Sequence, residues 1–418
     1  MARSLTPKDA HTLMTALVRQ ATGQDNITVV DTSSFVSAGE TVLATGIENT
    51  LNALGIVMGK TLMAVRPYEA KFKIINALNS DLYTSRVRKI SFYAQNPQAS
   101  GDWNTDLYTN FAKGYDNGSN SGNSTASMWE QKPAMPLEMN FGGQDVWDDQ
   151  LTVYENQLKV AFRDESEFIR FMNGAMTEKG NDIEQQKEAY SNMIVLNKIA
   201  SVYDMQNVMP NSVVNLTKLF NDEYGTDYDT QTILQSHKKE LLKLWVSEFK
   251  IISDRMTRRS TNYHWSVPKT VDGVQYDILR HTPKDKQRTM LYAPFFAKAE
   301  ADVLPEIFSP QYLKNPAQGE MVDFWQNIND PSAIKVTPAV TNTSTGVQEQ
   351  GNSVDIPFVL GMLYDEDALM VDFQYEDSLT TPVEARKRYR NIFWHFSKNG
   401  ICDPTENCVI FIMEDYTP

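Results

Sequence analysis

The sequence predicts an α+β protein organised around one long helix, and three observations lead to this prediction. First, residues 164–205 carry a helical period, because apolar side chains recur three or four residues apart on one stripe: Phe168, Met172, Met176, Ile183, Tyr190, Met193, Ile194 and Ile199. Second, segments on both sides of this helix contain short runs of strand-forming residues. Third, 418 residues exceed what one simple core holds, so two or three lobes are expected.

The long helix has recognisable ends. Asp164 followed by Glu167 predicts a variant of the capping box, and Pro210 stops the helix beyond its last turn. At ~1.5 Å per residue the rod is on the order of 60 Å long. Gly174 and Gly180 each cost about 1 kcal/mol relative to alanine. Packing along the stripe must therefore hold the helix, and a rod of this length needs other elements packed against it.

The first 60 residues predict two helices with a turn-rich piece, Ile27–Ser33, between them. The first lies within residues 1–22, and its apolar side is Ala10, Leu13, Met14, Leu17 and Val18. The second spans Gly39–Met58, and its apolar side is Val42, Leu43, Ile47, Leu51, Leu54 and Val57. Both are too short to enclose a core, so we expect an N-terminal arm that packs on other structure.

Residues 61–150 predict a long two-stranded excursion. Strand-forming runs occur between Leu62 and Tyr93 and resume at Pro136–Phe141, with Leu151–Tyr154 following. Between them, residues 114–126 form a Gly/Asn/Ser-rich run that predicts a flexible tip. An isolated hairpin is marginal in water, so we expect it to lie on a neighbouring subunit. Shortening residues 114–126 should leave the monomer folded and alter assembly.

The part of the chain beyond the long helix is mixed. Helices are predicted over residues 211–222 and 229–258, and a short strand over Gln275–Leu279. Beyond Pro331 the predicted strands are Ile334–Val336, Asp355–Leu360, Asn391–Phe396 and Asn407–Ile412, with a turn at Gly400 and Asp403–Pro404 between the last two.

Composition excludes several classes of protein. The net charge of −14 argues against tight, nonspecific binding to nucleic acid through phosphate neutralisation. No run approaches eighteen consecutive apolar residues, so no membrane span is predicted. The segment Met1–Pro7 leads into mixed polar sequence without an apolar signal core, and we do not expect secretion through a cleaved signal.

Motifs that carry chemistry are not found. The sequence has no phosphate-binding loop, dinucleotide fingerprint, zinc-protease motif or nucleophile elbow, and the five histidines are scattered: His11, His237, His264, His281 and His395. Cys402 and Cys408 favour two reduced thiols, with a disulfide closing the short loop as the alternative. His395 combined with these cysteines matches no zinc spacing and lacks a fourth ligand.

The clusters of charged residues in the sequence do not require a catalytic or binding site. Carboxylates gather at Asp365–Asp367 and at Asp145, Asp148 and Asp149, and such groups could form a hydrolase pair or a site for a hard cation. In a chain with 53 acidic residues, however, neighbouring carboxylates arise without function. Arg86, Arg88 and Lys89 favour a solvated strand face over a phosphate site. We therefore expect no catalytic, cofactor-binding or metal-binding residues, no cofactor and no enzyme.

The order of parts resembles the major capsid protein of tailed bacteriophages, with its Hong Kong 97-type shell fold. Val359–Val371 is similar to the sequence that precedes the last strands of many phage head proteins. Asn391–Phe396 followed by Thr405–Ile410 is similar to their closing strands. Ala21–Asp25 is also similar to head proteins of gut-associated phages.

The resemblance implies a division of the chain into six segments. They are an N-terminal arm at 1–60, an extended loop at 61–150, a peripheral domain with the spine helix at 151–213, an axial domain at 214–330, a return to the peripheral domain at 331–384, and C-terminal strands in the axial domain at 385–418.

The function implied by the resemblance is self-assembly into the icosahedral head shell that encloses the double-stranded DNA of a tailed phage. The chain would pair with itself in pentamers and hexamers, and with a portal, a scaffold and, where the phage has one, a decoration protein. We expect the scaffold to be a separate protein, DNA to be contacted only nonspecifically, and no membrane to be involved. The expected location is the virion, and the cytoplasm of the host bacterium during assembly.

Two other functions remain as alternatives. One is the shell protein of a cellular nanocompartment with the same fold, which a groove for a cargo peptide would distinguish. The other is a hydrolase that uses the acidic clusters, which would be a compact monomer or dimer with a concave carboxylate site.

Overall fold

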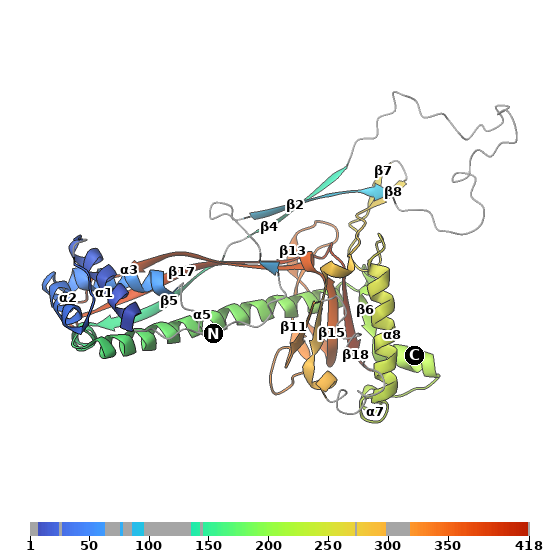
Figure 1. Ribbon diagram of the computed structural model, residues 1–418. Coiled ribbons are helices and arrows are strands. Elements are labelled where there is room, and N and C mark those ends of the chain that lie inside the picture. Colours follow the sequence, from blue (N-terminus) through green and yellow to red (C-terminus); the bar gives the residue numbers. More distant parts are fainter. Residues whose placement is uncertain are drawn as a thin grey trace, which may run out of the picture.

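The protein is elongated, with a helical lobe at one end, a sheet-rich lobe at the other and one long helix running between them (Figure 1). The computed structural model describes residues 7–24, 27–62, 76–77, 86–95, 135–142, 145–271, 274–297 and 318–416.

The long helix is helix α5, Glu165–Asp204, and it is continuous over 40 residues. It confirms the predicted spine, and neither Gly174 nor Gly180 breaks it. The helix ends at Met205, whose N–H donates to the carbonyl of Ser201 at 2.9 Å. Packing on both lobes therefore outweighs the cost of the two glycines.

The start of the spine differs from the prediction. Asp164 has the extended backbone of an N-cap residue, but its side chain makes no capping hydrogen bond. Its carboxylate instead accepts a hydrogen bond from the Ser166 hydroxyl. The predicted capping box is therefore wrong. Beyond the helix, Pro210 begins a short 3-10 turn, Pro210–Ser212.

Three helices form the lobe at the N-terminal end: α1 (Pro7–Thr22), α2 (Thr32–Ala44) and α3 (Ile47–Leu62). The first confirms its prediction and buries Ala10, Met14, Leu17 and Val18. The single helix predicted over residues 39–58 is wrong, because Gly46 has φ +97° and ends the helical path between α2 and α3. Leu62, expected in a strand, is the last residue of α3.

A four-stranded sheet lies beside these helices. Its order is β1-β16-β17-β5, with β1 at Asn76–Ala77, β16 at Leu369–Thr380, β17 at Tyr389–Cys402 and β5 at Asp145–Tyr154. Helix α4, Glu155–Ala161, follows β5 directly. Buried side chains of the three N-terminal helices, α4, β5, β17 and the first half of the spine form one apolar core.

A five-stranded sheet forms the second lobe. Its order is β10-β9-β15-β18-β6, with β10 at Gln318–Val322, β9 at Gln287–Tyr292, β15 at Phe358–Asp365, β18 at Cys408–Met413 and β6 at Val213–Asn215. The helices of this lobe are α6 (Leu216–Tyr224), α7 (Thr230–Ser236) and α8 (Lys238–Met256). Strands β9, β15 and β18 are buried almost throughout, which is typical of strands covered on both faces.

Shorter strands pair outside these two sheets. They are β11 (Ile334–Val336) with β14 (Val354–Ile356), β12 (Ala339–Thr341) with β13 (Gln348–Gln350), and β3 (Ala94–Gln95) with β8 (Val274–Asp277) and β7 (Lys269–Val271). The predicted strands at Ile334–Val336 and Gln275–Leu279 are thereby confirmed, the latter as far as Asp277.

The spine belongs to both lobes. Ile183 is buried in the first core and Ile194 in the second. Between them, the Tyr190 ring lies edge-on to Phe373, with 5.6 Å between ring centroids. The backbone of Gly400 lies so close to Ile194 that a Cβ atom would collide with that side chain. The spine thus packs against sheet as predicted, while the side chain of Met176 lies outside the described residues.

Helix predictions beyond the spine are partly wrong. The segment 211–222 begins with strand β6 before α6 starts, and Asn215 caps α6 by accepting from the N–H of Thr217 at 3.0 Å. The segment 229–258 is interrupted at His237, which separates α7 from α8.

The last two predicted strands exist but are not partners. Strand β17 belongs to the four-stranded sheet and β18 to the five-stranded sheet, so the chain passes from one lobe to the other between them. Gly400 lies inside β17 instead of in a turn. The turn occupies residues 404–406.

Candidate assembly arm and its polar root

A two-stranded ribbon, hereafter the hairpin arm, lies apart from the spine (Figure 1). It consists of β2 (Arg86–Phe92) and β4 (Pro136–Gly142), which pair antiparallel over their whole length. The described ends of the predicted excursion therefore pair as expected. The predicted tip at 114–126 lies outside the described residues.

The hairpin arm has one face toward the body and one toward solvent. Lys89 and Ser91 face the body, whereas Ile90 and Phe92 are 50% and 58% exposed. Residues on β4 alternate in the same way. The outer side of the ribbon therefore offers two apolar side chains, close together on one strand, for contact with another surface.

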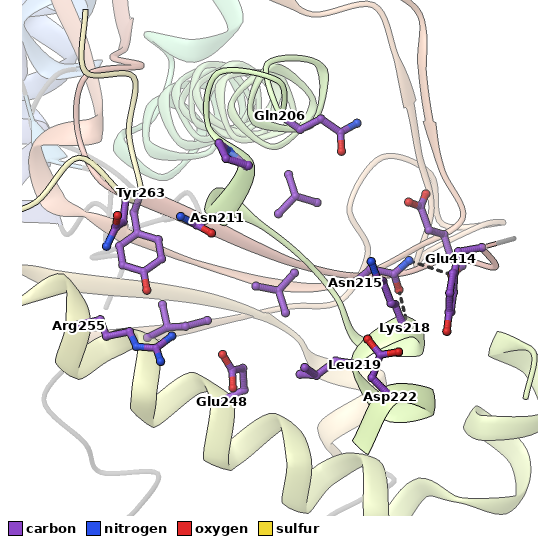
Figure 2. A pocket seen from close by; sticks show the side chains of 16 residues that line it. Gln206, Asn211, Asn215, Lys218, Leu219, Asp222, Glu248, Arg255, Tyr263 and Glu414 are labelled. Carbon is purple, nitrogen blue, oxygen red and sulfur yellow. Dashed lines mark hydrogen bonds between the residues drawn. The ribbon is translucent and has the colours of Figure 1, made fainter. Parts of the chain in front are cut away.

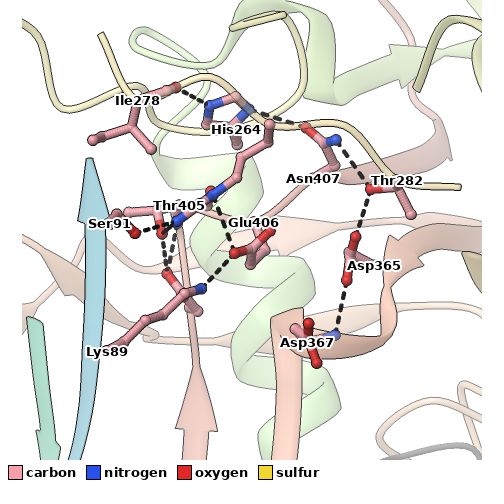
Figure 3. A network of polar contacts seen from close by, with 12 residues as sticks. Lys89, Ser91, His264, Ile278, Thr282, Asp365, Asp367, Thr405, Glu406 and Asn407 are labelled. Carbon is pink, nitrogen blue, oxygen red and sulfur yellow. Dashed lines mark hydrogen bonds and ion pairs between the residues drawn. The ribbon is translucent and has the colours of Figure 1, made fainter. Parts of the chain in front are cut away.

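Polar contacts hold the body-facing side, and we call this cluster the polar root: Lys89, Ser91, Arg280, Asp403, Thr405 and Glu406. Figure 3 shows Lys89, Ser91, Thr405 and Glu406 of this cluster close together. The Lys89 ammonium lies between two carboxylates, and it donates to Asp403 and, at 2.5 Å, to Glu406 Oε1. Both acids come from the segment between β17 and β18. A residue of the arm is thus fixed to the place where the chain crosses between the lobes.

Arg280 ties the arm and this segment together a second time. Its Nη2 donates to Ser91 Oγ at 2.7 Å, and its Nε donates to the Thr405 carbonyl at 3.0 Å. The same Nε lies 3.1 Å from Glu406 Oε1. Two cations therefore share two buried carboxylates, as a buried ionic cluster requires.

Burial and charge oppose each other within the polar root. Burial would raise the pKa of Asp403, but Lys89 and hydrogen bonds from Thr405 outweigh burial and lower that pKa. For Glu406 burial prevails over Lys89 and Arg280, and its pKa is raised. Burial would lower the pKa of Lys89, but the two carboxylates reverse this and raise it. Lys89 is therefore the cation around which the cluster is built.

A second connection lies just beyond the arm. Strand β3 pairs antiparallel with β8, and the Lys269 ammonium lies 5.6 Å from the centre of the Tyr93 ring. The arm is therefore attached by a short β ladder, a cation–π contact and the polar root.

The predicted acidic clusters form structural contacts. Asp365 accepts from the Thr282 hydroxyl at 2.6 Å and from the N–H of Asp367 at 2.9 Å, so it orders the turn after β15. Glu366 Oε2 lies 2.5 Å from Arg288 Nη2.

The second acidic cluster belongs to the sheet of the first lobe. Asp145, Asp148 and Asp149 all lie on β5, and Asp149 Oδ1 pairs with Lys179 at 3.0 Å. Asp149 thus forms a structural ion pair with the spine.

The three residues of the predicted basic cluster, Arg86, Arg88 and Lys89, have different surroundings. Arg88 pairs with Glu138 across the exposed side of the arm at 2.8 Å, which fits a solvated strand face, whereas Lys89 enters the polar root. Arg86 is the first residue of β2. Sequence reasoning missed Asp403, Glu406 and Arg280, although the alternation of Lys89 and Ser91 along a strand was a signal that both face one partner.

The cysteines and histidines do not gather. Cys402 and Cys408 are free thiols, and burial raises the pKa of Cys408 to about 11. His264 is held at both ring nitrogens, 3.0 Å from Asn407 Oδ1 and 2.7 Å from the Ile278 carbonyl oxygen. Within the described ranges, no three His, Cys, Asp or Glu side chains group as a metal site does.

One cavity of about 700 Å³ lies between the end of the spine, β6, α6 and α8 (Figure 2). Its lining mixes both signs of charge, with Lys218 and Asp222 on α6 facing Glu248 and Arg255 on α8. No described helix is both long and apolar enough to cross a membrane.

These features define a class: an α+β shell subunit with a spine helix, two lobes and a projecting arm. The chain belongs to the Phi29-like phage major capsid protein family, whose model matches residues 147–412. It is therefore a structural protein that forms the capsid of the virion by self-association, and the nanocompartment and hydrolase alternatives are not favoured.

One solved structure agrees on the fold. The capsid structure of Staphylococcus phage Andhra matches with a TM-score of 0.51 and 9% identity, over 84% of this chain and 85% of that chain. It supports the Hong Kong 97-type fold predicted from the sequence.

Two further matches have lower scores. A structure of the head fiber and inner core protein of bacteriophage P68 has a TM-score of 0.44, with 8% identity over 82% of this chain and 84% of that one. The capsid of Cyanophage P-SCSP1u has a TM-score of 0.42, with 8% identity over 84% and 90%. No curated protein sequence matches the chain. The similarity to gut-associated phages stays a prediction.

Proposed function

We propose that this chain forms pentamers and hexamers of an icosahedral head around double-stranded DNA, and that it catalyses no reaction. One observation carries the proposal: the hairpin arm lies apart from the spine and exposes Ile90 and Phe92 on its outer side. A two-stranded ribbon is marginal by itself, and open strand edges with apolar side chains favour pairing with another chain. A neighbouring subunit supplies that cover.

The contacts of residues 1–60 and of residues 61–150 indicate different roles for these two segments. Helices α1, α2 and α3 bury their apolar sides against the spine and sheet of their own subunit. Within the proposed extended loop at 61–150, the hairpin arm is then the part that reaches a neighbour, since β1 and β5 lie in the subunit's own sheet. The proposed peripheral domain comprises 151–213 and 331–384, and the proposed axial domain 214–330 and 385–418. These bounds do not coincide with the two lobes, because β15 lies in the five-stranded sheet and β17 in the four-stranded sheet.

Other head proteins complete the proposed assembly. A portal, a separate scaffold and, where the phage has one, a decoration protein contact the shell. The net charge of −14 supports a wall that repels packaged DNA and contacts it only nonspecifically.

Electron microscopy of the expressed chain tests the proposal. We expect closed shells from the wild type and from Asn140→Ser, a polar change on the outer side of the arm. Ile90→Ser combined with Phe92→Ser should lower shell yield by about tenfold or more, because apolar anchors dominate interfaces. The melting temperature of the unassembled double variant should match the wild type. Shells at wild-type yield from the double variant would overturn the role of the arm, and a wild type that stays monomeric would overturn the function.

A further inference from the structure

The turn between β16 and β17 carries three consecutive cations, Arg386, Lys387 and Arg388, and we call these residues the basic turn. All three are exposed, in a chain whose net charge is −14. The turn lies at the end of the molecule that holds the N-terminal helices, because Arg390 just beyond it donates to the Glu48 carbonyl on α3 at 3.0 Å.

The backbone of the basic turn is fixed. Arg388 has φ +52°, a conformation that costs a residue with a side chain about 1 kcal/mol or more. Its N–H donates to the Glu384 carbonyl at 2.8 Å, and its own carbonyl accepts from the N–H of Glu155 at 3.1 Å. The N–H of Lys387 donates to the Glu384 carboxylate at 2.5 Å. These bonds hold the strained turn in one shape.

The surroundings of the basic turn are aromatic and apolar. Tyr154 is 44% exposed, and its ring centroid lies 5.7 Å from that of Tyr389. Val160 is exposed on α4, the helix whose first residue, Glu155, contacts Arg388. Arginine and tyrosine with apolar neighbours are the residues most enriched at the centres of protein–protein interfaces.

One cation of the turn already binds a carboxylate. Arg388 Nη1 lies 3.3 Å from Glu155 Oε2, while Lys159 pairs with Glu155 Oε1 at 2.5 Å. Among the described residues, Arg386 and Lys387 form no ion pair through their side chains. The turn thus presents two cations from a fixed backbone, and neither has an ion-pair partner in the part of its own subunit that the structure describes.

We propose that the basic turn docks on an acidic surface of a second copy of this chain. The proposal rests on the proposed shell function and names one of its contacts. Neutralising phosphates needs no fixed backbone and no tyrosines, so the rigid turn with its aromatic border fits a protein surface better than nucleic acid. Copies that each carry −14 also repel one another, and a local patch of opposite charge is what lets them approach in register.

Removal of the two free cations tests the docking. Arg386→Gln with Lys387→Gln should raise the protein concentration needed for shell formation by about tenfold, without a change in the melting temperature of the monomer. Lys239→Gln with Lys243→Gln on α8 removes the same charge from exposed positions elsewhere and should leave assembly at the wild-type level. Equal loss in both double variants would show an effect of net charge and overturn the proposal.

A cross-link identifies the partner. Shells assembled from a mixture of ¹⁴N- and ¹⁵N-labelled chains are treated with a carbodiimide, which joins an amine to a carboxylate in direct contact. We expect Lys387 linked to an Asp or Glu of the other isotope. Links only within one isotope would overturn the proposal, and so would wild-type assembly of the Arg386/Lys387 variant with reduced DNA content, which would mean a phosphate contact. If the wild type itself forms no shell, the proposed function fails instead.

Discussion

The spine and the hairpin arm are attached to the body by opposite kinds of contact. The spine buries apolar side chains in two cores, with Val195 and Ile199 fully buried. The arm is held by Lys89 between two carboxylates and by Arg280. One subunit can therefore hold the spine permanently by apolar packing, and hold the hairpin arm in a specific position from which it can detach.

Magnitudes support this distinction. Burial of an aliphatic side chain stabilises a fold by about 1.5–3 kcal/mol, and the spine has many such residues. A buried ion pair contributes little net stability, because desolvation offsets the Coulomb attraction, yet it specifies geometry. Undocking the polar root returns its charged groups to water, whereas undocking the spine exposes apolar surface.

The largest effect is expected on the spine. Ile194→Asp places an unpaired charge in the second core and should destabilise the monomer by about 3–5 kcal/mol. Met193→Asp is the matched control, because Met193 is 54% exposed on the same helix and Ile194 only 7%. Chemical unfolding of both variants measures the difference. Equal stability of the two would contradict the packing of the spine described here.

A smaller and more local effect is expected at the polar root. Lys89→Met leaves Asp403 and Glu406 buried without their main cation, which costs about 3–5 kcal/mol if the arm stays docked. The arm should therefore detach, which limits the loss for the body. Hydrogen exchange should accelerate in β2 and β4 but not in α5.

Arg88→Met serves as the control for this experiment, because its pair with Glu138 is solvent-exposed. We expect its exchange rates to stay near those of the wild type, since exposed pairs contribute about 0–1 kcal/mol. Faster exchange in the spine of the Lys89 variant would show that arm and body form one cooperative unit.

The smallest effect is a dependence of arm docking on pH. Asp403 has a pKa below its ordinary value of 3.8. Its contribution to docking is therefore fully present above pH 3.8 and is lost as the pH falls below that value. Lys89 has a raised pKa, so its contribution is present below 10.5 and is lost as pH rises through its higher docked value. Glu406 has a pKa above its ordinary value of 4.5, so the docked arm binds this proton more readily than the free arm. Protonation of Glu406 therefore strengthens docking as the pH falls toward 4.5.

Moderate acid should therefore leave the arm docked. Exchange in β2, corrected for the intrinsic pH dependence, should stay slow from neutral pH to 4.5 and accelerate below 3.8 and above 10.5. Glu406→Gln should remove the gain in protection just above pH 4.5. Release of the wild-type arm well above pH 4.5 would contradict the assignment of these shifts.

The sequence predicts the spine because its information is local. The helical period persists over 40 residues and outweighs two glycines, so the spacing of apolar residues is enough to predict the helix. Gly46 was misread for the same reason: apolar periods continue on both sides, and only its φ of +97° separates α2 from α3. Strand β6 was missed because it has only three residues. Its pairing with β18 at the edge of the sheet, more than its composition, makes it a strand.

The polar root could not be predicted, because its partners are remote in the chain. Lys89 and Asp403 are 314 residues apart. Sequence showed a basic cluster on a strand and an acidic turn, but nothing local indicates that they meet. The family, by contrast, was predictable from the order of elements, and the match over residues 147–412 confirms it.

Gly174 gives the spine a mechanical asymmetry. A Cβ atom there would meet nothing within 4 Å, so the glycine is not required by close packing, and it lies in the half of the helix that serves the N-terminal lobe. Glycine lowers the resistance of a helix to bending, because its backbone is less restricted. The spine is therefore a beam with a compliant half and a stiff half. We expect a subunit loaded within a curved wall to flex first in the half of the spine that carries Gly174.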